Sequence, residues 1–172
     1  MKIQHALIGA VLGGLSLPAL AHSGDSASGF WQGVIHPLTG LDHLAAIVCL
    51  GVWLSTMPRG LAVKSIMAVA ALFFGSIVLA GNIEGAQLQL LEMAVLVSVA
   101  IVGLLAVTKA QLGALTPAIA AAIFTCHGLA HGTEAAAAIS SFAAGSTLSL
   151  VVLVVGVYAL GLATPLFRSK WA

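Results

Sequence analysis

The chain has 172 residues, of which 60% are apolar and only 6% are charged, and its formal net charge is +1. A soluble domain has roughly 25% charged residues, so this composition excludes a water-soluble globular protein and indicates one whose exterior faces lipid. The near-neutral charge, without any basic run, argues against nucleic acid as a partner. Cys49 and Cys126 both lie in apolar stretches and predict no disulfide framework.

The first residues have the pattern of a secretory signal peptide. Lys2 supplies a positive charge, residues 6–17 form an apolar region, and Ala19 and Ala21 offer a cleavage site of the A-x-A type. We therefore expect residues 1–21 to be a signal peptide, with an uncleaved anchor as the alternative. Residues 22–172 would then form a single transmembrane domain. Cleavage would make His22 the N-terminal residue, whose amine and imidazole offer a weak chelating pair.

Five apolar stretches follow, each close to the roughly 17–25 residues that a helix needs to cross a bilayer. They cover residues 41–57, 61–81, 88–108, 113–131 and 146–167. These stretches lack the alternation of barrel strands, so we predict an all-α polytopic membrane helix bundle with about five transmembrane helices. Segments 28–38 and 134–144 would each make a sixth. The second either extends the fourth span outward or folds back as a short interfacial helix.

The basic residues that follow the predicted signal peptide all fall on one side of the predicted bundle. They are Arg59, Lys64, Lys109, Arg168 and Lys170. The positive-inside rule assigns this side to the cytoplasm. The mature N-terminus is then external and the C-terminus cytoplasmic, in agreement with a signal peptide. The sequence therefore predicts a multi-pass protein in the lipid bilayer with a defined orientation.

Metal-binding side chains gather at the external ends of two spans. They are His36, Asp42 and His43 around the start of the first, and His127, His131 and Glu134 at the end of the fourth. The second group has helical spacing, so its side chains project from one face. Asp42 and His43 are adjacent and diverge by about 100° on a helix, so they converge on one ion only where a helix begins or unwinds. Pro37 and Gly40 make a non-helical stretch plausible, and His36 would then fold back over the site.

Glu92 lies a short way into the third span, at the edge of the predicted hydrocarbon layer. Ionisable residues in membrane segments are costly and usually mark ion or substrate paths. We therefore interpret Glu92 as a step of the pathway below the histidines, with a buried helix–helix hydrogen bond as the alternative. Asp42 also suits the first turn of a helix through the helix dipole, and a single interfacial histidine is usually only a satisfied polar group.

Imidazole nitrogen combined with carboxylate oxygen suits borderline divalent ions, Ni²⁺ and Co²⁺ among them. We therefore expect a permease for such an ion and neither an enzyme nor a protein with a prosthetic group. No nucleotide-binding motif is present, so an ion gradient, the membrane potential or a partner would drive transport. One alternative is a membrane metalloenzyme, in which two histidines and a glutamate hold a catalytic Zn²⁺. Another is an accessory protein that binds metal without transporting it.

Two motifs resemble the signatures of a known family. Residues 36–43, His-Pro-Leu-Thr-Gly-Leu-Asp-His, resemble the H-P-x-x-G-x-D-H signature of the HupE/UreJ nickel permeases, and residues 127–134 resemble their H-G-x-A-H-G-x-E signature. Leu91, Glu92 and Ser98 are similar to the acidic segment of the family's third span. The resemblance implies nickel uptake across the bacterial inner membrane to supply hydrogenase or urease, with Co²⁺ as the alternative substrate. It also implies metal roles for His36, Asp42, His43, His127, His131 and Glu134.

Overall fold

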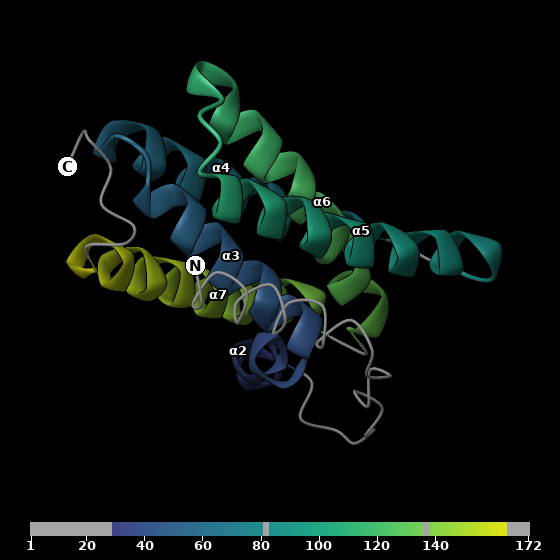
Figure 1. Ribbon diagram of the computed structural model, residues 1–172. Coiled ribbons are helices and arrows are strands. Elements are labelled where there is room, and N and C mark those ends of the chain that lie inside the picture. The colour runs from purple at the N-terminus through teal and green to yellow at the C-terminus, as the bar shows by residue number, and fades with distance from the viewer. Residues whose placement is uncertain (1–28, 81–82, 136–137, 165–172) are drawn as a thin grey trace.

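The computed structural model describes residues 29–80, 83–135 and 138–164, and the regular structure within these ranges is helical (Figure 1). The elements are α2 (Phe30–Thr39), α3 (Leu41–Ser55), α4 (Arg59–Leu79), α5 (Ala86–Thr108), the short 3₁₀ helix η1 (Gly113–Leu115), α6 (Thr116–Glu134) and α7 (Ile139–Ala163). The predicted all-α polytopic bundle is confirmed. The predicted signal peptide over residues 1–21, His22, Arg168 and Lys170 lie outside the described residues.

Four of these helices, α4 to α7, are long and apolar enough to cross a membrane. Helix α3 has 15 residues, about 22 Å at 1.5 Å per residue, which is short of a hydrocarbon core about 30 Å thick. It passes the same test only together with α2, from which it is bent by 82°. The described residues therefore hold four spans, or five if the bent pair counts as one. The sequence-based expectation of about five agrees with the larger count.

Helix α2 shows how a proline is accommodated before the bend. We expected Pro37 and Gly40 to give a non-helical stretch, but α2 continues through Pro37 and the helical structure is interrupted at Gly40 alone. Proline has no N–H, so it leaves the carbonyl four residues earlier without its helical partner. That carbonyl belongs to Gly33, and it accepts a hydrogen bond from Ser146 Oγ at 3.1 Å. A side chain of α7 thus replaces the missing backbone donor.

The structure corrects the interpretation of residues 134–144. This segment neither extends the fourth span nor forms a separate interfacial helix, because α6 ends at Glu134 and residues 139–144 are the first turns of α7. The reason lies in the contact between α2 and α7, where glycines allow the two backbones to touch. A Cβ atom at Gly145 would overlap the carbonyl oxygen of Phe30, and one at Gly33 would overlap that of Phe142. Helix α7 must therefore start early enough to pack against α2.

The helices pack in pairs around a core of large apolar side chains. Helix α4 runs along α6, α2 lies on α7, and α3 contacts both α5 and α7 (Figure 1). Trp53, Phe73 and Phe124 are among the largest side chains that are fully buried in this core. The sequence suggested that Gly128 and Gly132 leave room for a partner helix, and the structure identifies it as α4. A Cβ atom at either glycine would overlap α4 atoms.

Hydrogen bonds join two connectors at the end of the bundle opposite the α2–α3 bend. Trp53 Nε1 donates to the Ala110 carbonyl at 2.9 Å, and Gln111 Nε2 donates to the Thr56 carbonyl at 3.3 Å. The connector before Arg59, the first residue of α4, and the connector that begins at Lys109 therefore lie side by side, as the charge pattern predicted. The outer faces of the long helices expose large apolar side chains such as Met67 on α4. Such faces fit a lipid bilayer, so the chain is a multi-pass membrane protein.

Candidate metal centre

Three imidazoles converge at the end of the bundle where α2 meets α3. His36 comes from α2, His43 from the first turn of α3 and His131 from the last turns of α6. One nitrogen atom from each lies within 4.8 Å of the other two. Two nitrogens on one ion, with bonds of about 2.1 Å, lie roughly 3 to 4 Å apart. The three rings therefore need to close by only about an ångström to hold a common ion.

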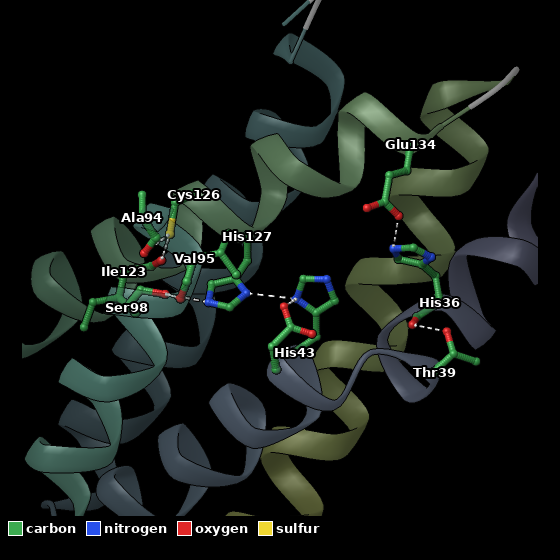
Figure 2. A network of polar contacts seen from close by, with 11 residues as sticks. His36, Thr39, His43, Ala94, Val95, Ser98, Ile123, Cys126, His127 and Glu134 are labelled. Carbon is green, nitrogen blue, oxygen red and sulfur yellow. Dashed lines mark hydrogen bonds and ion pairs between the residues drawn. The ribbon is translucent and has the colours of Figure 1, made fainter. Parts of the chain in front are cut away.

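His127 joins this group through His43. The Nδ1 atoms of the two rings are 3.1 Å apart (Figure 2). On its other side the His127 ring contacts Ser98 of α5, with 2.7 Å between Nε2 and Oγ. The carboxylate of Asp42 lies 3.6 Å from His43 Nδ1. His43 is thus in contact with both an acid at the start of α3 and the deeper imidazole of α6.

His36 folds over the cluster, as the sequence suggested for a chain that bends near Gly40. Its ring centroid is 4.4 Å from that of His131. Its Nε2 atom lies 3.0 Å from Oε2 of Glu134, at the end of α6 (Figure 2). The structure therefore brings together all six residues that the two sequence motifs proposed as ligands. Whether they bind metal stays a prediction.

Exposure falls steadily from the carboxylates to the imidazoles of α6. The Glu134 and Asp42 side chains are 38% and 24% exposed, those of His36 and His43 are 12% and 11%, and His131 is 1% exposed. Within the described residues, His131 Nδ1 is buried without a hydrogen-bond partner. An unpaired buried polar atom is costly, and a cation would supply the missing partner. The acids therefore lie at the accessible edge of the cluster, and the histidines form its buried interior.

Aromatic rings enclose the histidines, a feature that the sequence analysis missed. Phe124 stacks on His127 with centroids 5.2 Å apart, and Phe73 lies edge-on to His131 at the same distance. Phe142 lies edge-on to His36 at 5.5 Å. These rings exclude water, which strengthens electrostatic interactions at the cluster. Of the three, only Phe124 could have been placed beside a histidine from the sequence, since it precedes His127 by one helical turn. Phe73 and Phe142 lie on other helices.

The structure does not bring Glu92 to the cluster. Its side chain is exposed on α5, whereas Ser98, six residues later, faces His127. Six residues at about 100° each place the two side chains about 120° apart around the helix. The buried helix–helix hydrogen bond considered as an alternative is wrong, because the side chain is exposed. Its role in the pathway stays a proposal.

Fold and site together define a class: a multi-pass α-helical membrane protein with a candidate metal centre at one end of the bundle. The sequence matches the family described as HupE / UreJ protein over residues 10–171. A curated relative, Protein HupE from Rhizobium leguminosarum bv. viciae, is 36% identical over 141 residues, which cover 77% of this chain and 70% of the relative. The chain belongs to the HupE/UreJ family. No solved structure matches it.

Proposed function

We propose that this protein takes up a divalent transition metal, nickel before cobalt, across the bacterial inner membrane to supply hydrogenase or urease. The observation that carries the proposal is the group of three imidazoles, His36, His43 and His131, within 4.8 Å of one another in a bundle of spanning helices. Borderline divalent ions favour nitrogen ligands of this kind. Membership of the HupE/UreJ family supports the choice of nickel.

The gradient of exposure suggests how the ion would enter. Asp42 and Glu134 would attract a hydrated cation, since carboxylates at a partly enclosed site raise the local cation concentration. His36 and His43 would then replace part of its water shell. The contact between His36 and Glu134 must open for this exchange, because it closes the outer side of the cluster. His131 and His127 would take the ion deeper into the bundle.

The direction of transport follows from the two ends of the bundle. The basic connectors near Arg59 and Lys109 would face the cytoplasm, so the histidine cluster would face the periplasm. A cation that carries two charges gains about 4.6 kcal/mol on entering a cell whose interior is negative by about 100 mV. The membrane potential alone would therefore favour uptake.

Cellular uptake at limiting nickel tests this proposal. His43→Ala and His131→Ala each remove one imidazole from the group of three, so we expect nickel accumulation to fall to the level of cells without the protein. Ser65→Ala is the matched control, because Ser65 is buried on α4 and, among the described residues, its hydroxyl donates to the Leu61 carbonyl within its own helix alone. Wild-type accumulation by either histidine variant at equal expression would show that the site is assigned wrongly.

Glu92 needs a separate test because it lies apart from the cluster. A carboxylate exposed on a membrane helix is costly, which supports a role in the pathway or in a contact that covers it. Glu92→Gln keeps the size of the side chain and removes its charge. A loss of nickel uptake with unchanged nickel binding would place Glu92 on the pathway, and unchanged uptake would remove it from the proposal.

A second candidate function is that of a membrane metalloenzyme, because three histidines can also hold a catalytic Zn²⁺ with an open position. Purified protein loaded with zinc would then hydrolyse ester or amide substrates, and His131→Ala would abolish that activity. A third is an accessory protein that binds the ion without moving it. Such a protein would bind nickel in detergent and give no nickel accumulation in vesicles.

A further inference from the structure

Ser98 is a buried serine on α5, a helix that contributes none of the six proposed ligands. Its side chain is 5% exposed. Its Oγ lies 2.7 Å from the carbonyl oxygen of Val95, within the same helix, and 2.7 Å from Nε2 of His127 on α6 (Figure 2). The first distance is typical of a hydrogen bond between two oxygens, and the second lies at the short end of the range for one between nitrogen and oxygen. Ser98 therefore joins α5 to the deepest imidazole of the cluster.

The hydrogen atoms in this arrangement can be assigned by elimination. A serine hydroxyl carries one hydrogen, and a carbonyl oxygen can only accept. Ser98 also contacts the thiol of Cys126. If Ser98 donated to His127 Nε2 or to this thiol, its Oγ and the Val95 oxygen would be two acceptors 2.7 Å apart with no hydrogen between them. If Ser98 donates to Val95, the Oγ lone pair accepts from an N–H group on Nε2, and both contacts are hydrogen bonds. The proton of His127 is therefore on Nε2.

A neutral imidazole carries one N–H, so Nδ1 of His127 keeps a free lone pair. This lone pair faces His43, whose Nδ1 is 3.1 Å away. In the absence of an ion, His43 can donate a hydrogen bond across this distance. The same distance also suits two nitrogens bound to one ion, since bonds of about 2.1 Å at a right angle place them about 3.0 Å apart. The tautomer set by Ser98 thus makes His127 ready to receive a cation.

We propose that Ser98 is a positioning residue that locks His127 in the Nε2–H tautomer, so that Nδ1 points to His43 and binds the transported metal. This inference rests on the proposed transport function. Histidines that bind metals usually donate a hydrogen bond from the N–H of their second ring nitrogen to a fixed acceptor, which orients the ring and sets its tautomer. Here the acceptor is a serine hydroxyl whose own hydrogen is held by the Val95 carbonyl of α5.

Removal of the hydroxyl should reverse the tautomer. In Ser98→Ala the Nε2–H group of His127 would lose its acceptor in a buried site, which disfavours this tautomer. The proton is then better placed on Nδ1, where it can donate to His43. We expect nitrogen NMR of protein with ¹⁵N-labelled histidine to show Nε2–H at His127 in the wild type and Nδ1–H in the alanine variant. His127→Gln assigns the signal, and Ser98→Thr, which keeps the hydroxyl group and adds a methyl group, should preserve the wild-type pattern.

Nickel binding to the purified full-length chain supplies the second readout. Loss of a partner that orients a ligand typically weakens metal binding by about 10–100-fold, so we expect this loss in Ser98→Ala, little change in Ser98→Thr and none in the control Ser65→Ala. The wild-type spectrum alone can overturn the proposal, which would be wrong if His127 carried its proton on Nδ1. A changed tautomer with unchanged nickel affinity would overturn it as well. If the wild type binds no nickel, the proposed function fails while the tautomer result still stands.

Discussion

At the scale of single residues, the proposed function gives the two acids and the four histidines different roles: the acids would attract the cation, and the histidines would replace its water. Asp42 and Glu134 remain partly exposed, whereas His127 and His131 are almost completely buried. We call Asp42 and Glu134 the rim of the cluster. The charge of a rim carboxylate attracts a cation from a distance, whereas a buried imidazole binds only a cation that has lost part of its water. The effects of substitution should therefore differ between rim and interior.

Glu134→Gln tests the rim. The amide can still contact His36, but the charge is lost, so we expect the nickel concentration for half-maximal uptake to rise about tenfold with a smaller change in maximal rate. Initial uptake rates over a range of nickel concentrations measure both quantities. Glu84→Gln removes an exposed carboxylate from the connector before α5, on the same side of the bundle. An equal effect of the two variants would show that general surface charge, and not the position of Glu134, matters.

The residues also show what could be predicted from the sequence. His127, His131 and Glu134 share one helix, so their spacing alone places them together. The sequence left open whether His36, Asp42 and His43 converge, because this depends on an 82° bend at Gly40. The aromatic rings around the histidines could not be predicted, since Phe73 and Phe142 contact them from other helices, α4 and α7. The pattern of residues within one helix does not show which other helices pack against it, so contacts between helices cannot be predicted from it.

At the scale of elements, the position of His36 depends on the contact between α2 and α7. Gly33 and Gly145 allow the two backbones to touch, and Ser146 satisfies the carbonyl that Pro37 leaves free. The apolar pattern places the start of the last span at residue 146 and does not indicate this contact, because residues 139–144 carry no charge and have no distinct boundary signal. Helix α7 is thus longer than its apolar core suggests, since its first turns support α2.

Gly145→Ala should destabilise the protein by about 1–3 kcal/mol, because the new methyl group would overlap the Phe30 backbone, which cannot move aside freely. Thermal unfolding in detergent measures the effect as a lower midpoint. Gly156→Ala is the matched control on the same helix, since no atom lies within 4 Å of the position of its Cβ. The packing account of α2 and α7 would be wrong if the two variants unfolded at the same temperature.

At the scale of the whole molecule, the bundle has two chemically different ends. Histidines and acids lie at the bend of α2 and α3. Arg59 and Lys109 lie at the other end, where hydrogen bonds of Trp53 and Gln111 join the two connectors. The charge pattern predicted this separation correctly, because loop charges can be read along the chain once the spans are found. Which end faces the cytoplasm is a proposal that rests on the same rule.

Labelling of single cysteines tests the orientation. In a background with Cys49 and Cys126 replaced by alanine, Glu84→Cys and Ala114→Cys place one exposed thiol at each end. We expect a membrane-impermeant maleimide to label Glu84→Cys once the outer membrane is permeable, and to label Ala114→Cys only after the inner membrane is disrupted. The reverse pattern would place the histidine cluster in the cytoplasm and would contradict uptake through it.

The central claim is that the imidazole group of His36, His43 and His131 admits a divalent metal to a pathway through the membrane. Nickel flux into proteoliposomes tests it most directly, with an inside-negative potential imposed and cobalt and zinc added as competitors. We predict that the wild type accumulates nickel, that cobalt competes better than zinc, and that His131→Ala accumulates no more than empty vesicles. Accumulation by His131→Ala at the wild-type rate, or nickel binding without any flux in the wild type, would contradict the account.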